Sequence, residues 1–269
     1  MVRRIVQSIA VFVFNPWLPN FLSGRLYTGK LKNACLPVLN CHSCPAATGA
    51  CPIGGLQAAL GERNWITLHV VGLLGLFGAI AGRFACGWLC PFGYLQDGLY
   101  KVPSRKFRVP KFLEWGKYAT LIVLVIALPL LWVDEFGYST GPWFCKTLCP
   151  AGTLEAAVPL LGVGAEQIPD RPYYLILKSA ILVAFLGWMV VSKRPFCRTA
   201  CPLGAIYGLF NRTSLLRVRV DEAKCVKCDL CQVKCPMDLR VYEDADRAGC
   251  VLCLSCRKVC PKGAVGFGL

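Results

Sequence analysis

Charged residues and histidine are scarce in this chain. Of its 269 residues, 17% are charged and 55% are hydrophobic, with a mean hydropathy of +0.51. An ordinary soluble domain carries about 25% charged residues, so this composition excludes a typical water-soluble globular enzyme. The two histidines, His42 and His69, argue against a bis-histidine haem within the chain.

Catalytic signatures are absent as well. The sequence has no glycine-rich nucleotide motif, no Ser-His-Asp set and no flavin attachment signal. Acidic residues are few, with 15 Asp and Glu against 30 Lys and Arg, for a net charge of +15. In an apolar chain such an excess marks cytoplasmic loops more often than a nucleic-acid surface. We therefore predict a non-catalytic membrane protein that does not bind nucleic acid.

Four apolar stretches predict transmembrane helices, because a span needs about 20 mostly apolar residues. Asn15, Pro16 and Pro19 interrupt the first stretch, so we expect it to have a broken outer end. No small-x-small cleavage site follows it, which favours a retained anchor over a signal peptide. The predicted spans are 5–24, 64–82, 118–133 and 173–192.

The distribution of Lys and Arg predicts the orientation of these spans. Basic residues dominate the amino end, the loop 84–116 and the segment after 192, whereas acidic residues dominate 134–172. We expect both termini and the middle loop to be cytoplasmic, with 134–172 and the mildly basic 25–63 on the outer side. The chain would then be a multi-pass protein of the cytoplasmic membrane.

Residues 225–261 contain the four-cysteine run of bacterial ferredoxins twice. In each run the cysteine before Pro is expected to ligate the other cluster. One [4Fe-4S] cluster is thus predicted on Cys225, Cys228, Cys231 and Cys260, and a second on Cys235, Cys250, Cys253 and Cys256. Structural zinc also uses C-x2-C spacing, but two complete runs that each end in Pro favour the clusters.

The other ten cysteines follow an internal repeat. Cys51, Cys90, Cys149 and Cys201 each precede Pro-x-Gly and an apolar stretch that predicts a half-helix. Segments 5–100 and 117–210 each read span, Cys-Pro, span, Cys-Pro, so an axis along the membrane normal should relate them. The sequence predicts a mainly α membrane domain over 1–210 and a two-cluster α+β ferredoxin-like domain over 211–269.

Topology sorts the membrane-half cysteines into two sets of four. An inner [4Fe-4S] cluster is predicted on Cys86, Cys90, Cys197 and Cys201, and an outer one on Cys44, Cys51, Cys145 and Cys149. Cys35 and Cys41 are substitutes for the outer set, and Cys35, Cys41, Cys44 and Cys51 could also bind a cluster alone. Disulfides or free thiols are the plainer alternative. A helix amino end at each Cys-Pro would favour the negative charge of a cluster.

Two segments carry a resemblance to a known group. Arg83-Phe-Ala-Cys86-Gly-Trp-Leu-Cys90-Pro91 and Arg194-Pro-Phe-Cys197-Arg-Thr-Ala-Cys201-Pro202, followed by a two-cluster ferredoxin, resemble membrane iron–sulfur proteins of the NapH, NosR, MauN and CcoG type. The resemblance implies four spans, a cytoplasmic ferredoxin domain and electron exchange between quinone and a partner oxidoreductase. The Cys145 motif and the stretch from Cys35 to Cys51 depart from that pattern.

These departures predict a chain of clusters that crosses the bilayer. We expect an electron-transfer subunit of a larger oxidoreductase complex, which relays electrons between a cytoplasmic redox partner and membrane or outer-side carriers. Its partners would be other subunits and a soluble ferredoxin or flavodoxin. The alternative is a CcoG-like maturation factor that reduces a metal or a disulfide. Eighteen thiols indicate an anaerobic host, because exposed thiolates oxidise.

Overall fold

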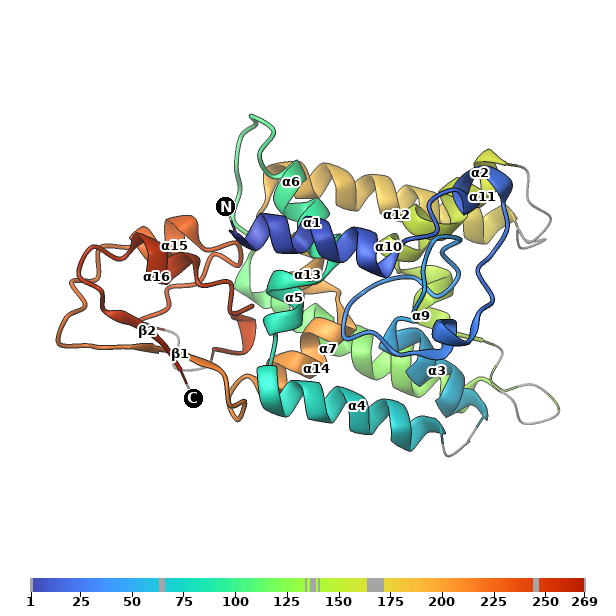
Figure 1. Cartoon of the computed structure of the whole chain (residues 1–269), viewed down its shortest axis with the longest axis horizontal. Helices are drawn as coiled ribbons and strands as arrows, with labels where there is room; N and C mark the ends of the chain where they lie inside the picture. Colours follow the sequence, from blue (N-terminus) through green and yellow to red (C-terminus); the bar gives the residue numbers. More distant parts are fainter. Residues whose placement is uncertain are drawn as a thin grey trace.

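A computed structural model describes most of the chain, and it is mostly helical. The long helices run side by side in one body, and a smaller lobe with two strands lies at one end (Figure 1). The amino end and the carboxyl end both lie at the end of the molecule that carries this lobe. The described residues are 2–62, 66–133, 135, 139, 141–163, 172–243 and 247–268.

Two stretches of the described chain are long and apolar enough to cross a membrane. The first, Lys111–Leu131, contains η2 (Lys111–Trp115), α7 (Gly116–Thr120), η3 (Leu121–Ala127) and α8 (Leu128–Leu131). The second, Tyr173–Val191, lies in α12 (Pro172–Val191). Only 11% of its apolar 18-residue stretch is buried inside the protein. Outward-facing apolar side chains such as Ile122, Ile176 and Val183 suit a lipid environment.

The other two expected spans are shorter helices. In the described part of 64–82, α4 runs over Ile66–Ala81, and residues 64 and 65 lie outside the described chain. In 5–24, α1 (Val2–Phe14) ends before Pro16 and the short α2 (Asn20–Ser23) follows. Pro16 disfavours a helical Asn15 and donates no hydrogen bond. The 13 residues of α1 rise about 20 Å, less than the thickness of the hydrocarbon core.

The internal repeat is visible in the backbone. After each of three long helices comes a helix of five residues and then a helix that begins at the Pro of Cys-Pro. The amide of the Cys-Pro cysteine donates each time to the carbonyl five residues earlier, at 3.0 Å for Cys90, Cys149 and Cys201. The pairs are α5 (Phe84–Trp88) with α6 (Pro91–Leu99), α9 (Trp143–Thr147) with α10 (Pro150–Gly152), and α13 (Pro195–Thr199) with α14 (Pro202–Phe210).

The first Cys-Pro helix lacks such a preceding partner. It is α3 (Pro52–Glu62), and an irregular segment with only η1 (Lys30–Asn33) leads into it from α2. The third Cys-Pro helix continues from α10 through η4 (Thr153–Ala157) and α11 (Val158–Gly162). The four repeat units therefore share the helix after Cys-Pro but differ in what precedes it.

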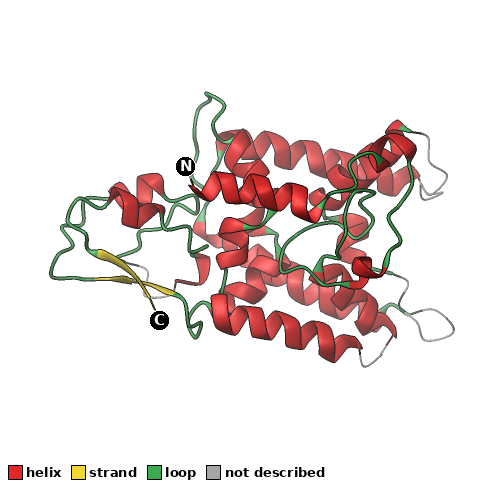
Figure 2. Cartoon of the chain, in the orientation of Figure 1, coloured by secondary structure: helices red, strands yellow, loops and turns green. Residues whose placement is uncertain are grey.

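The small lobe is built from a two-stranded antiparallel sheet and two short helices (Figure 2). Strand β1 (Arg217–Val220) pairs with β2 (Val265–Gly268), so both ends of this region close on one another. Helices α15 (Leu230–Lys234) and α16 (Ser255–Val259) pack together, and η5 (Arg247–Gly249) links them. The lobe has its own small core, formed by Val218, Val241, Leu252, Cys256 and Val265.

The lobe packs closely against the helical body. At Gly87, in α5, a β-carbon would collide with the carbonyl oxygen of Val251, so only glycine permits this approach. The indole Nε1 of Trp88 donates to the carbonyl of Leu252 at 3.0 Å, and Asn211 Nδ2 donates to the carbonyl of Cys250 at 2.6 Å. The second ferredoxin run is thereby held next to the helix that carries Cys86.

Candidate iron–sulfur sites

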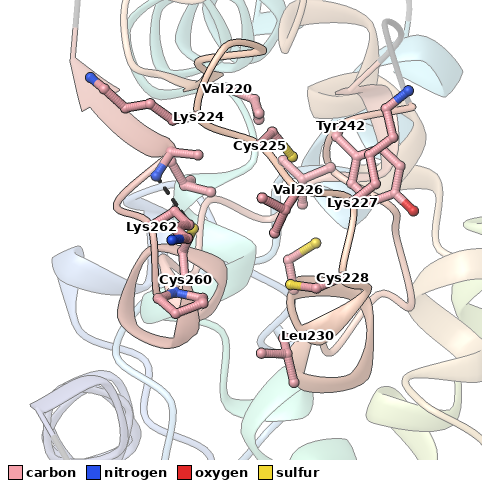
Figure 3. Close-up of a pocket in the computed structure, with 15 residues that line it drawn as sticks. Val220, Lys224, Cys225, Val226, Lys227, Cys228, Leu230, Tyr242, Cys260 and Lys262 are labelled. Atoms are coloured by element: carbon pink, nitrogen blue, oxygen red, sulfur yellow. Dashed lines mark hydrogen bonds between the residues drawn. The ribbon is translucent and has the colours of Figure 1, made fainter.

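The four cysteines predicted for the first ferredoxin cluster line one pocket in the lobe. They are Cys225, Cys228, Cys231 and Cys260. In the close-up, the labelled Cys225, Cys228 and Cys260 surround a shared space (Figure 3). Apolar side chains, including Val220 and Val241, complete the wall. Cys228 is exposed, so this site lies near the surface of the lobe.

The four cysteines predicted for the second ferredoxin cluster also lie together. Burial and then the neighbouring thiolates of Cys253 and Cys250 raise the pKa of Cys235 to about 12. Burial and the thiolates of Cys253, Cys250 and Cys235 likewise raise the pKa of Cys256 to about 12. Thiolates that are crowded and buried need a compensating cation, which iron would supply.

The inner set converges from the two halves of the repeat. Cys86 and Cys90 come from the second unit, Cys197 and Cys201 from the fourth, and all four are buried. Burial and then the thiolates of Cys197 and Cys86 raise the pKa of Cys90. The same causes raise the pKa of Cys201, with Cys90 adding to them. Four mutually close thiols from two helix pairs form a donor set that fits a cubane.

At this site two buried arginines each bond the half of the repeat opposite to their own. Arg83 donates to the carbonyl of Cys197 at 3.3 Å, and Arg194 donates to the carbonyl of Cys86 at 3.0 Å. Arg194 also pairs with Asp97 at 2.6 Å. Arg83 is fully buried, has no carboxylate partner within the described residues, and leaves its Nε without a partner there. An anionic cluster at this site would compensate that charge.

At the outer site the structure places Cys51, Cys145 and Cys149 close together, with Cys41 as their fourth neighbour. Burial is the main cause that raises the pKa of Cys149, and the neighbouring thiolates of Cys145, Cys41 and Cys51 raise it further. A β-carbon on Gly152 would stand 3.5 Å from Cys41 Sγ, and one on Gly54 would stand 3.9 Å from Cys145 Sγ. Each Cys-Pro-x-Gly helix thus faces the other unit's cysteine across the site.

Cys44, the cysteine that we expected at this place, lies in a different environment. It packs in a separate small cluster with Ala46 and Ala47, and its Sγ lies 3.8 Å from the Asn15 side chain. Lys32 Nζ donates to the Cys44 carbonyl at 2.9 Å. Cys35 lies beside Cys51, in a segment that bridges to Ala50. Of the two predicted substitutes, Cys41 is the one that faces Cys145 and Cys149.

A site for a single metal ion is a different arrangement. Within the described ranges, no three His, Cys, Asp or Glu side chains are grouped so as to hold one ion. In a cubane each thiolate binds a different iron atom, so its ligands stand further apart than those of a single ion.

Sequence reasoning did not assign roles to several side chains that reach the cysteines. Gln96 Nε2 donates to Cys197 Sγ at 2.9 Å, and Gln57 Nε2 donates to Cys145 Sγ at 3.5 Å. Both glutamines stand six residues after a Cys-Pro cysteine, in the repeated pattern Cys-Pro-x-Gly-x-Leu-Gln. The repeated pattern was the signal that could have identified them.

Comparison with known proteins identifies a family of iron–sulfur proteins. A family model described as a 4Fe-4S binding domain matches three consecutive segments, 64–110, 119–165 and 176–221, which together exceed half of the chain. Each segment contains one long apolar helix and one C-x3-C-P motif. The matches leave out the unit that contains Cys41 and Cys51, and they leave out the ferredoxin runs after residue 221.

Curated relatives carry related names. An uncharacterized protein of Methanocaldococcus jannaschii is 30% identical over 77% of this chain and 73% of its own length. The ferredoxin-type protein NapH of Haemophilus influenzae is 26% identical over 87% of this chain and 73% of its own length. The methylamine utilization ferredoxin-type protein MauN of Methylorubrum extorquens is 27% identical over 85% of this chain and 71% of its own length.

No solved structure matches the chain. The resemblance to NapH and MauN that the sequence indicated is confirmed by these relatives. The three copies of the 4Fe-4S model contain Cys86, Cys90, Cys145, Cys149, Cys197 and Cys201, six of the cysteines described above. The chain therefore belongs to the 4Fe-4S binding family that includes the ferredoxin-type proteins NapH and MauN.

Proposed function

We propose that this protein is a membrane-embedded electron-transfer subunit that relays electrons through four [4Fe-4S] clusters. Iron–sulfur electron transfer is the activity that the 4Fe-4S family and the ferredoxin-type relatives support. The finer proposal is a path from a cytoplasmic redox partner, through the ferredoxin lobe, to carriers in the membrane or on its outer side. The ligands would be the two ferredoxin sets, the inner set, and Cys41, Cys51, Cys145 and Cys149.

The observation that carries the proposal is that the donor sets follow one another along the molecule. The Arg194 guanidinium lies within electrostatic reach of both Cys253, in the second ferredoxin set, and Cys197, in the inner set. Gly87, next to Cys86, touches the Val251 carbonyl, which lies between Cys250 and Cys253. The lobe's second cluster and the inner cluster would therefore be direct neighbours.

Tyr207 links the inner and outer sets. Its side chain is fully buried, and its hydroxyl has no hydrogen-bond partner within the described residues. The same hydroxyl lies within electrostatic reach of Cys86, in the inner set, and of Cys51, in the outer set. An electron would not have to cross about 30 Å of hydrocarbon in a single step, because protein and clusters fill the interval.

Electron transfer across a vesicle membrane tests the proposed path. The full-length protein is reconstituted in liposomes that contain an impermeant oxidising dye, and an impermeant reductant is added outside. We expect reduction of the internal dye, and its loss in the double variant Cys90→Ser, Cys201→Ser, because the inner cluster would be missing. Equal dye reduction by the two proteins would contradict a transmembrane relay.

We propose that the surface around the first ferredoxin cluster receives a small acidic electron carrier. Lys224, Lys227 and Lys262 line its pocket, and all three are exposed. Val226 and Leu230 expose apolar side chains beside Cys228. An apolar centre with a cationic rim suits a transient complex with an acidic protein, because complementary charge accelerates encounter.

Reversing these charges should slow reduction by an acidic ferredoxin. In stopped-flow mixing at low salt we expect Lys224→Glu, Lys227→Glu, Lys262→Glu to lower the second-order rate about tenfold or more, with a weaker dependence on salt. The matched control is Lys101→Glu, Arg105→Glu, two exposed cations of the loop 84–116. A larger effect in the control would place docking on that loop instead.

The alternative, a maturation factor that reduces a metal or disulfide, depends on thiols outside the four sets. Cys35 and Cys44 are such thiols in this arrangement, and Cys44 is buried. If Cys35→Ser, Cys44→Ser abolished function in the host while leaving cluster content and electron relay unchanged, the maturation role would be favoured.

A further inference from the structure

The residue six positions after each Cys-Pro cysteine occupies an equivalent place in all four repeat units. These residues are Gln57, Gln96, Glu155 and Tyr207. Gln57, Gln96 and Tyr207 are buried, and Glu155 is partly buried. Each points away from its own unit, toward the unit that completes the same cysteine set.

Three of the four residues bond the first cysteine of the opposite unit, and Tyr207 lies near it. In the outer set, Gln57 bonds Cys145 Sγ, while Glu155 Oε2 accepts from the backbone amide of Cys41 at 2.7 Å. In the inner set, Gln96 bonds Cys197 Sγ and Tyr207 lies near Cys86. This shared geometry identifies Cys41 as the counterpart of Cys86, Cys145 and Cys197, although its sequence spacing differs.

The chemistry offered at this position differs between the two sets. The inner set has a short amide donor on a sulfur, from Gln96, and the buried Tyr207 hydroxyl, which has no hydrogen-bond partner within the described residues. The outer set has the longer contact from Gln57, and Glu155 turns an accepting oxygen toward Cys41. Hydrogen bonds to cluster sulfurs and net charge are among the factors that set reduction potential.

The surrounding cations do not reverse this difference. One buried cation, Lys32, lies near the outer cysteines and donates to the carbonyls of Cys44 and Ala47, and the partly buried Lys178 lies near Cys145, whereas two buried arginines, Arg83 and Arg194, lie at the inner set. Arg83, at the inner set, is fully buried and has no carboxylate partner within the described chain. A buried charge is screened much less by water and salt than an accessible one.

We infer that the sixth position after Cys-Pro tunes the two membrane clusters and holds the inner cluster at a higher reduction potential than the outer one. The inference rests on the proposed function, because it requires both membrane clusters. An electron shared between them would reside on the inner cluster, and transfer from the outer to the inner cluster would be downhill. The four residues are positioning residues: Gln57 and Gln96 act through ligand sulfurs, Glu155 through the Cys41 amide, and Tyr207 as a nearby hydroxyl.

The test is a redox titration of the full-length protein followed by electron paramagnetic resonance. The signal that is lost in Cys90→Ser, Cys201→Ser identifies the inner cluster. Glu155→Gln is close in size to the native side chain and offers an amide donor, so it should raise the outer potential. We expect a shift of about tenfold in the reduction equilibrium, about 59 mV for one electron, with the inner potential unchanged.

A second variant tests the inner set in the opposite direction. Gln96→Leu should lower the inner potential by a similar amount and leave the outer one unchanged. Thr120→Val is the control, because the buried Thr120 hydroxyl bonds the Gly116 carbonyl of its own helix and no other group among the described residues. It should move neither potential.

The outcomes separate this inference from the function on which it rests. An outer potential at or above the inner one in the unmodified protein, or no shift in Glu155→Gln and Gln96→Leu, would overturn the inference while leaving the relay intact. Iron content that shows no membrane clusters would overturn both.

Discussion

Anaerobically purified protein should contain about 16 irons and a similar amount of acid-labile sulfide per chain, because four cubanes hold four irons each. The double variant Cys90→Ser, Cys201→Ser should contain about 12, because each half of the inner set loses a ligand. Both cysteines begin a half-helix at a Cys-Pro and lie against Cys86 and Cys197. Iron and sulfide analysis measures the loss directly.

The double variant Cys35→Ser, Cys44→Ser is the matched control for this loss. It removes the same number of thiols, from the same membrane half, but neither residue lies in a proposed set. Its iron content should stay near that of the unmodified protein. Near eight irons in the unmodified protein, unchanged by Cys90→Ser, Cys201→Ser, would leave only a ferredoxin lobe on a thiol-bearing membrane domain. That result would favour the maturation role over the electron relay.

Cys41→Ser should remove the outer cluster, whereas Cys44→Ser should leave it in place. The two residues are three positions apart, but only Cys41 faces Gly152, Cys145 and Cys149. We expect about four irons fewer in Cys41→Ser, together with loss of one signal from the reduced protein. The inner and ferredoxin signals should persist, which shows that the chain has folded.

Cys44→Ser serves as the control because its sulfur lies beside Asn15, whereas Cys41 is the neighbour of Cys145 and Cys149. The opposite result, with the outer cluster lost in Cys44→Ser and retained in Cys41→Ser, would restore the ligand set expected from sequence. Loss in both variants would indicate that the irregular segment from Cys35 to Cys51 folds only as a unit around its cluster, and would leave the choice of Cys41 without support.

The ferredoxin sets and the inner set could be predicted because their spacing is regular. Short intervals such as Cys225-x2-Cys228-x2-Cys231 restrict where the thiols can lie, whatever packs around them. The repeat predicted the inner set, because equivalent Cys-Pro motifs that follow inward-going spans are expected to lie on the same side of the membrane. The structure brings Cys86, Cys90, Cys197 and Cys201 together, and their binding of a cluster stays a prediction.

The first repeat unit could not be resolved in the same way. Cys41 and Cys51 are ten positions apart, whereas the equivalent cysteines of the other units are four positions apart, and the intervening loop is irregular. Sequence distance does not say which thiol such a loop turns toward Cys145. The prolines after α1 predicted a break, but not that the helix would end at Phe14, too short to cross the hydrocarbon alone.

The sequence by itself determined the chemistry of this protein: cysteine-ligated iron, apolar helices, a repeated Cys-Pro unit and an excess of Lys and Arg. Each of these follows from local spacing or composition, which do not depend on how the helices are arranged in space. Only the tertiary structure decided that Cys41 faces the outer set and that Arg83 and Arg194 cross between the halves. It also decided that Gln57, Gln96, Glu155 and Tyr207 reach the opposite unit. Such contacts join residues far apart in the chain, so packing of the two halves alone creates them.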